Sequence, residues 1–369
     1  MSRSKITSSS IQDGTLTEAD WGGNQLSHRN LIINGDMRIA QRGTSYTINS
    51  PSSGVRVADR WNWQFFGTHT GSNWVTLTQE TDAPDGFSHS SKITTNVAQT
   101  GVNGDWLSYA LEAQDTLPLK DGVGQKDFTV SFWVKSNVTG NMTVAFENVN
   151  YSYSTYVTIQ TADTWEYKTA TFPATTLATG VDYTLNTSNS SVKFGLRSSG
   201  SWLVDVDDQW NDRSTNRGIL SSQQTNFMSA INNYVSITGV QLEVGSVATP
   251  FEHRSYGEEL ARCQRYYHRN DNVIGGKSIG SGFFYNSTVG FTHYDFPVEM
   301  RTAPSKSFSG LSDFRVLYGT GVKTATDSET ISGRNGARLG WTVSGATTGQ
   351  GFMVDCNNTT GWIAFDAEL

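Results

Sequence analysis

The sequence predicts an all-β fold with two antiparallel β-sandwich domains, joined by one short α-helix and preceded by an extended N-terminal segment. In many short runs, apolar residues alternate with Ser, Thr and Asn, and several runs follow one another at a spacing of roughly ten residues. This pattern is typical of half-buried antiparallel strands. Gly, at 36 of 369 residues, supplies turns between the runs. One stretch, RSYGEELARCQRYYHR, has helical spacing instead.

The N-terminal segment, residues 1–29, is polar and rich in Ser and Thr. Such a segment cannot bury enough apolar surface to fold alone. It is either a disordered tail or a segment that becomes ordered against a partner or against sister chains. In the second case its isolated apolar residues, spaced by five, are the anchors: Ile6, Ile11, Leu16 and Trp21.

Residues 30–253 are dense in strand patterns and form the first predicted sandwich. In KDFTVSFWVKS, Phe132 and Val134 belong to the face that packs in the core, so Trp133 should point outward. An outward Trp either binds a ligand or is covered by a neighbouring element. Gly239 interrupts the alternation of YVSITGVQLEVG and predicts a β-bulge. The other predicted strands lie in NLIINGDMRIAQRG, ADRWNWQFF, NWVTLTQE, NMTVAFEN, TWEYKTATF, SVKFGLRS and SWLVDVDD.

Residues 254–269 predict the helix. Ser255 followed by Glu258 fits a capping box. The apolar stripe is narrow and flanked by charged residues, which favours packing of helix on helix. Two interpretations remain open: a linker helix that lies on its own sandwich, or a short parallel bundle of identical helices near a symmetry axis. The stripe consists of Tyr256, Leu260, Cys263 and Tyr267.

Residues 270–369 return to short, Gly-bounded strand patterns and predict a second, smaller sandwich. The last run, WIAFDAEL, has the pattern of a strand held in a sheet. Aromatic residues of this domain could form an adaptable polar-aromatic surface. The candidates are Tyr285, His293, Tyr294, Tyr318 and Trp341.

Composition argues against several classes of function. The net charge is −7, whereas a nucleic-acid binder needs a basic face. No apolar run approaches the roughly 18–20 residues of a membrane span, and no catalytic motif stands out. The six His residues have no ligand spacing, so we expect neither a metal site nor a cofactor. Cys263 and Cys356 are expected to be thiols made in a reducing cytoplasm.

Two further patterns leave alternatives open. The cluster LVDVDDQWND contains Asp205, Asp207, Asp208 and Asp212, which could hold calcium, belong to a carboxylate pair of a glycosidase, or form a solvated turn. The run RWNWQFF places Trp61 and Trp63 on one face. That face either stacks on a sugar or forms the core.

The two ends of the first domain carry a resemblance. The stretches NLIINGDMRIAQRGTSYT…VADRWNW and ITGVQLEVGSVATPFEHRSYGEELARCQRYY resemble the start and the end of a module found in bacteriophage tail-fibre and other virion-appendage proteins. They bracket residues 30–267. The region between resembles carbohydrate-binding-module-like jelly rolls, although Thr238 and Gly239 stand where such modules often carry an Asp near a calcium site.

The resemblance implies a homotrimeric tail fibre of the virion, assembled in the host cytoplasm. Its N-terminus would attach to a phage tail or adaptor protein, and its β-domains would bind a host-surface glycan or protein without enzymatic activity. A structural virion decoration or connector, or a glycan depolymerase, is the alternative. The chain lacks the sequence repeat of a long β-helix that such depolymerases usually have.

Overall fold

The structure is a computed structural model, and its chain divides between Arg254 and Ser255 into two compact units. Each unit is described by itself below. The residues that the structure describes are 28–49, 54–67, 69, 71–101, 104–122, 124–148, 150–176, 188–200, 203–204, 207–213, 218–271, 278–319, 321–324, 330–356 and 360–369. None of the helices among them has the length and apolar character that crossing a bilayer requires.

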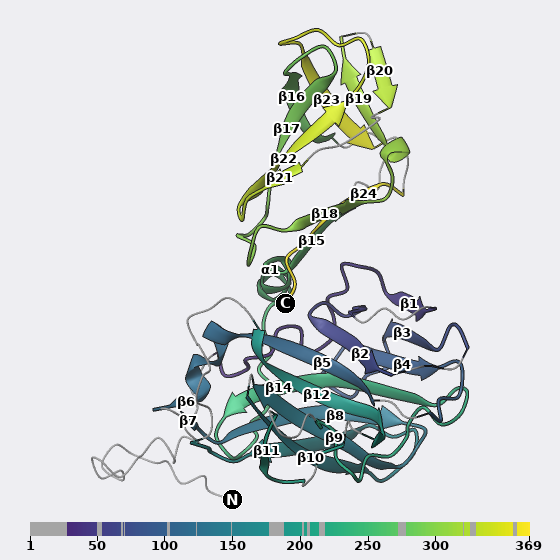
Figure 1. The fold of residues 1–369 in the computed structure, drawn as a ribbon, viewed down its shortest axis with the longest axis vertical. Coiled ribbons are helices and arrows are strands. Elements are labelled where there is room, and N and C mark those ends of the chain that lie inside the picture. The colour runs from purple at the N-terminus through teal and green to yellow at the C-terminus, as the bar shows by residue number, and fades with distance from the viewer. Residues whose placement is uncertain are drawn as a thin grey trace, which may run out of the picture. The chain divides into compact units, whose positions relative to one another are not determined.

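Unit 1 contains two six-stranded antiparallel sheets (Figure 1). In spatial order, the first consists of β1 (Ser45–Ile48), β3 (Val75–Glu80), β4 (Ser90–Thr95), β14 (Tyr234–Val244), β8 (Phe128–Ser136) and β11 (Glu166–Phe172). The second consists of β13 (Trp210–Asp212), β10 (Tyr151–Ile159), β9 (Gly140–Asn148), β12 (Ser188–Ser198), β5 (Gly104–Glu112) and β2 (Trp61–Phe66). A 3-10 helix, η2 (Ala113–Leu119), and a small hairpin of β6 (Lys120–Asp121) and β7 (Gly124–Gln125) follow β5.

The two sheets of unit 1 pack face to face around an aromatic core. Phe132 of β8 contacts Phe194 of β12, with ring centroids 4.8 Å apart. The alternation predicted for β8 is confirmed, because Phe132 and Val134 are buried while Trp133 is half-buried on the opposite face. Trp61 is fully buried together with its neighbour Trp63, so the core interpretation of RWNWQFF is correct. The antiparallel β-sandwich predicted for this domain is therefore present.

One predicted strand of unit 1 is wrong. Residues 30–43 contain no strand, because side chains replace a ladder there. The Asn34 amide group donates to the carbonyls of Ile39 and Asp59, and its oxygen accepts from the Ile39 N–H. Half of the predicted strand SWLVDVDD lies outside the described residues, and its described residues, 203–204 and 207–208, contain one isolated bridge, from Leu203 to Leu220. Seven strands of unit 1 were not predicted, namely β1, β4, β5, β6, β7, β10 and β13.

The bulge predicted at Gly239 is present in β14. The register of β14 against β8 shifts between Thr238 and Gln241, and Gly239 has a φ of 61°. A Cβ at this position would lie 2.6 Å from the Phe87 ring and 3.1 Å from Trp133. Glycine is therefore required both by the backbone angle and by the aromatic side chains around it.

Asn30 bonds to β14 directly after this bulge, beyond Ile237, where β4 no longer pairs with β14. Its side-chain oxygen accepts from the N–H of Leu242 at 3.1 Å and of Ile32 at 2.9 Å. Its amide group donates to the Val240 carbonyl at 3.1 Å. Asn30 is buried, so each bond replaces one that water would otherwise supply. The start of the sandwich is thereby bonded to its last strand.

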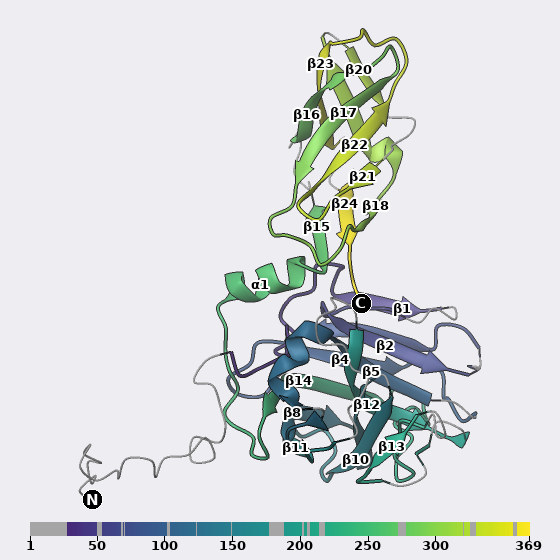
Figure 2. The ribbon, with the colours of Figure 1, turned by 60° about the vertical axis from the view of Figure 1, so that its left-hand side comes forward.

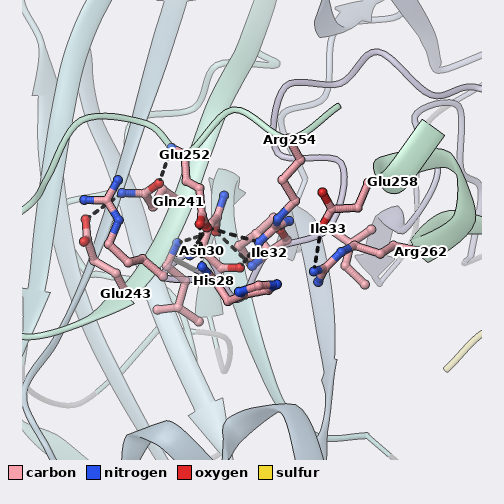
Figure 3. Close-up of polar contacts among 12 residues, drawn as sticks. His28, Asn30, Ile32, Ile33, Gln241, Glu243, Glu252, Arg254, Glu258 and Arg262 are labelled. Atoms are coloured by element: carbon pink, nitrogen blue, oxygen red, sulfur yellow. Dashed lines mark hydrogen bonds and ion pairs between the residues drawn. The ribbon is translucent and has the colours of Figure 1, made fainter. Parts of the chain in front are cut away.

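Glu252 and Arg254 complete this connection (Figure 3). The Glu252 carboxylate accepts from the N–H groups of His28 and Asn30, and its own N–H donates to the Gln241 side chain at 2.8 Å. Arg254 donates to the carbonyls of Ile32 and Asn30. We call Asn30, Gln241, Glu252 and Arg254 the clasp. It bonds residues separated by more than 200 positions.

The pKa of the clasp carboxylate, Glu252, is lower than that of an ordinary glutamate. Burial acts to raise the pKa of Glu252. Several interactions lower the pKa by more than burial raises it, namely the hydrogen bond from the Asn30 N–H, the charge of Arg254 and further donors. The pKa therefore falls below its usual 4.5. The folded state therefore favours the ionised carboxylate.

Unit 2 begins with helix α1 (Tyr256–Gln264). The Ser255 hydroxyl accepts from the Glu258 N–H at 3.3 Å, so the predicted N-cap is confirmed. The prediction that the helix extends through residue 269 is wrong, because β15 (Tyr267–Asp271) pairs along its whole length with β24 (Trp362–Asp366). Tyr267 is therefore a buried strand residue and not a fourth member of a helical stripe.

The remainder of unit 2 contains a three-stranded and a seven-stranded antiparallel sheet (Figure 2). The first has the order β15, β24 and β18 (Ser305–Phe308). The second consists of β20 (Gly321–Thr324), β19 (Phe314–Tyr318), β23 (Gly351–Cys356), β16 (Ser278–Phe284), β17 (Val289–Asp295), β22 (Gly336–Thr342) and β21 (Thr330–Ser332). A short 3-10 helix, η4 (Leu311–Asp313), precedes β19.

The two sheets of unit 2 share one core, as predicted for a second sandwich. Phe365 of β24 contacts Tyr294 of β17 at 5.1 Å and Phe296 at 4.7 Å between ring centroids. His268 of β15 is buried beside this core, with Nε2 2.8 Å from the Tyr294 hydroxyl. Burial lowers the pKa of His268 from 6.5 to about 4, because the interior disfavours the imidazolium. Cys263 and Cys356 are both buried thiols.

We expect the clasp to contribute measurably to the free energy of unfolding of unit 1. Glu252→Ala leaves the His28 and Asn30 N–H groups without their acceptor and should lower the free energy of unfolding by about 2 kcal/mol. Because the folded-state pKa of Glu252 lies below 4.5, the wild-type free energy of unfolding should fall as the pH drops below about 4.5. Urea unfolding followed by Trp fluorescence, at several pH values, measures both effects.

The matched control for Glu252→Ala is Asp85→Asn, which removes an exposed carboxylate from the same unit. We expect it to change the free energy of unfolding by less than about 0.5 kcal/mol. Equal effects of the two substitutions would contradict the role given to the clasp.

We expect a second pH dependence of stability, in unit 2, that comes from His268. Its pKa is lower in the folded state, so its neutral form contributes full stability above pH 6.5. That contribution should decline as the pH falls from 6.5 toward 4, by at most about 3 kcal/mol. His268→Gln should remove this part of the pH dependence. NMR titration of the His268 Cε1 proton provides the direct test, and a folded-state midpoint near 6.5 would contradict it.

Candidate ligand-binding surface

An open concavity lies on the outer face of the seven-stranded sheet of unit 2. Its volume is about 590 Å³, within the range of roughly 300–1,000 Å³ that small-ligand sites occupy. It spans β16, β17, β22 and the turn between β16 and β17. Its lining residues are Phe283, Tyr285, Phe291, Thr292, His293 and Arg338.

Strand alternation and register place these side chains together. On β17, Phe291 and His293 point outward while the intervening Thr292 is buried. Phe291 pairs with Phe283 of β16, and His293 pairs with Arg338 of β22. Directly opposed residues in an antiparallel ladder have their side chains on the same face and in contact range. Three neighbouring strands thus contribute to one surface.

Tyr285 reaches this surface from the hairpin turn. Its N–H donates to the Val289 carbonyl at 2.8 Å. The Asn286 side chain accepts from the N–H groups of Thr288 and Val289, which is the Asx-turn pattern that fixes a tight turn. The Tyr285 ring is 67% exposed and lies 6.1 Å from the Phe291 ring. The turn therefore holds a largely solvated aromatic ring beside the sheet.

Glycine residues leave room beside the rings. Phe291 pairs with Phe283 on one side and with Gly340 of β22 on the other. Phe283 pairs with Gly351 of β23 on its far side, and a Cβ added to Gly351 would meet only the Gly282 carbonyl, at 3.8 Å. Gly351 has no side chain to cover Phe283, which is 57% exposed.

The polar groups of the concavity are a guanidinium and an imidazole. The Arg338 guanidinium lies over the Phe291 ring, 4.4 Å from its centroid. His293 Nε2 lies 2.9 Å from Asp295, the next outward residue along β17. Aromatic rings with a few fixed polar groups can bind a ligand that has both an apolar face and hydrogen-bonding edges.

The structure brings only two of the sequence-predicted surface residues together, namely Tyr285 and His293. Tyr294 and Trp341 are wrong as surface candidates, because they are 8% and 3% exposed and belong to the core. They occupy inward positions of β17 and β22, where alternation puts the core side chains. Tyr318 is half-buried, packs against the same core and meets the Phe284 ring edge to face, with ring centroids 5.1 Å apart.

Trp133 lies in unit 1 and is not part of the concavity. It points outward from β8, as predicted, and its ring centroid lies 5.5 Å from that of Tyr167 on β11. Together with Phe87 it surrounds the vacant side-chain position of Gly239. These neighbours leave Trp133 half-buried.

Four residues of the concavity were missed from the sequence: Phe283, Phe291, Thr292 and Arg338. The run SGFFYNSTVGFTHYD contains a signal for the two Phe residues, because strict alternation puts one ring of the Phe283–Phe284 pair on each face. Arg338 carries no such signal. Arg338 belongs to the concavity because of the register between β17 and β22, and the sequence does not specify that register.

The other predicted sites have different outcomes. Tyr256 is 57% exposed on α1, Leu260 is half-buried and Cys263 is buried. The proposed anchors Ile6, Ile11, Leu16 and Trp21 lie outside the described residues. Asp207 accepts hydrogen bonds from Ser221 and Ser222, and Asp205 is not described. Among the described residues, no group of three or more His, Cys, Asp or Glu side chains could hold a metal ion.

No protein-family model matches this sequence, and no curated protein is similar to it. Solved structures that resemble parts of the chain include the xylan-binding module CBM22-1 of Xyn10C from Paenibacillus barcinonensis. It has a TM-score of 0.26 and 11% identity, over 55% of this chain and 94% of that chain.

Two further solved structures give similar values. TmCBM61 in complex with β-1,4-galactotriose has a TM-score of 0.26 and 11% identity, over 58% of this chain and 99% of that one. The tandem CBM22-1–CBM22-2 of the Paenibacillus protein has a TM-score of 0.28 and 10% identity, over 93% and 97%. At these TM-scores the likeness supports no conclusion on fold or ligand.

Proposed function

We propose that this protein binds a glycan, without enzymatic activity, through the concavity on the outer face of the seven-stranded sheet. The observation that carries the proposal is the exposure of two aromatic rings, Phe283 and Tyr285, beside a third, Phe291, in one concavity. A soluble domain rarely leaves such rings exposed in one patch unless they contact a ligand or a partner.

The chemistry of the concavity suits a sugar. A pyranose ring has an apolar face of C–H groups, which can pack on the exposed faces of Phe283 and Tyr285. Its hydroxyl groups are both donors and acceptors. The Tyr285 hydroxyl and His293 at the edge of the concavity can bond to them.

We further propose that the chain is a subunit of a trimeric virion fibre, attached to a phage tail or adaptor protein through residues 1–29. The proposal rests on the resemblance of the two ends of residues 30–267 to those of virion-appendage modules. The clasp supports treating these ends as one unit, because Asn30 and Glu252 are bonded to each other. Three copies would turn weak single-site contacts into firm attachment to a host surface.

Two substitutions test glycan binding. Phe283→Ala and Tyr285→Ala each remove an exposed ring from the concavity. Each should weaken binding to a surface polysaccharide of the host about tenfold, since one aromatic stacking contact is worth roughly 1 kcal/mol or more. Binding is measured by affinity electrophoresis against a panel of purified bacterial surface polysaccharides.

Tyr156→Ala is the control, since it removes an exposed Tyr of unit 1. We expect it to leave binding unchanged. A polysaccharide that binds wild type and both concavity variants with the same affinity would place the site elsewhere, and failure to bind any of the panel would argue against a glycan.

The trimer has its own test. Tyr256 and Leu260 lie one turn apart on α1, so they are the remaining candidates for a contact between helices. Leu260→Asp should shift the mass measured by light scattering from trimer toward monomer. The matched control is Arg262→Asp, which adds a carboxylate on the opposite side of the helix. A wild-type monomer, or equal dissociation of both variants, would contradict a helix contact.

A further inference from the structure

The charge of the residues that line the concavity indicates which kind of glycan it can bind. Its lining contains one permanent cation, Arg338, and no carboxylate among the described residues. The chain as a whole has a net charge of −7, so this local positive charge runs against the general balance. A ligand that fits the lining should therefore supply an anionic group.

The guanidinium of Arg338 is placed to receive such a group. Its guanidinium carbon lies over the Phe291 ring, 4.4 Å from the ring centroid, within the range of a cation–π contact. The N–H groups at the edge of a stacked guanidinium remain available to an acceptor, and their fork matches the two oxygens of a carboxylate. His293, directly opposite on β17, borders the same space.

Another arginine of the same sheet provides a contrast. Arg315 of β19 forms a two-pronged ion pair with Asp355 of β23, at 2.9 and 2.6 Å, so its fork is already occupied. In the described part of the chain, Arg338 has an aromatic ring as its close contact and no such carboxylate. Asp295 lies nearby but is paired with His293.

We propose that the concavity selects an acidic glycan, with the carboxylate of a hexuronate residue bound by Arg338 and the sugar faces packed on Phe283 and Tyr285. This inference rests on the proposed function, because it assumes that the concavity binds sugars. It adds a requirement that a neutral glycan would not meet.

The test compares an oligogalacturonate with its carboxyl-reduced counterpart, which has the same rings and linkages but no charge. Binding to the full chain is measured by isothermal titration calorimetry at low and high salt. We expect the acidic oligosaccharide to bind at least tenfold more tightly than the reduced one. This difference should shrink at high salt, because the interaction is exposed to solvent.

Variants assign the preference to Arg338. Arg338→Gln should weaken binding of the oligogalacturonate about fivefold to tenfold and leave binding of the reduced oligosaccharide unchanged. Asp295→Asn, which removes a neighbouring negative charge, should strengthen binding of the acidic ligand. The matched control is Lys323→Gln. It removes an exposed cation of β20 outside the lining and should have no effect.

The outcomes separate the two proposals. Equal binding of both oligosaccharides, weakened by Tyr285→Ala, would overturn selection of an acidic glycan while supporting the glycan site. Equal losses in Arg338→Gln and Lys323→Gln would also overturn it, because the effect would then come from general charge. Dextran sulfate that binds as tightly as oligogalacturonate would overturn recognition of a carboxylate. Tyr285→Ala binding as tightly as wild type would count against both proposals.

Discussion

The arrangement of unit 1 depends on how its last strand, β14, is bonded beyond the point where β4 ends. β4 pairs with β14 only as far as Ile237, so the Val240 carbonyl and the Leu242 N–H would lie unpaired in a buried region, which is costly unless other groups satisfy them. Asn30 supplies those partners, and Glu252 and Arg254 in turn hold the backbone of residues 28–32. The start and the end of the sandwich are therefore fixed by the same few polar side chains, directly before α1 begins.

Much of the fold could be predicted from the sequence because alternation reports burial directly. β8 and β9 were predicted on this basis, and the apolar faces assigned to them are buried. The predictions failed where side chains replace the ladder. Residues 30–43 have the composition of a strand, but Asn34 bonds the backbone of Ile39 and Asp59 instead. A sequence pattern does not distinguish these two ways of satisfying a backbone.

The candidate surface was less predictable, since it depends on register. Composition indicated that the second domain has aromatic residues, but only the pairing of β16, β17 and β22 determines which of them are outside. Tyr294 and Trp341 are aromatic and polar in the way a binding residue is, yet they lie on the inward side. Arg338 lies in the concavity because it pairs with His293 across two strands, and no local sequence pattern specifies that pairing.

The clasp also sets a condition on the order of folding. Its partners are more than 200 residues apart, so in a growing chain Asn30 is made long before Glu252 and Arg254 exist. Contacts of such long sequence separation form late, because much chain entropy must be lost first. During synthesis, residues 28–32 thus keep unpaired backbone groups until residue 254 has left the ribosome. We expect unit 1 to close after its own synthesis ends, while α1 is already emerging.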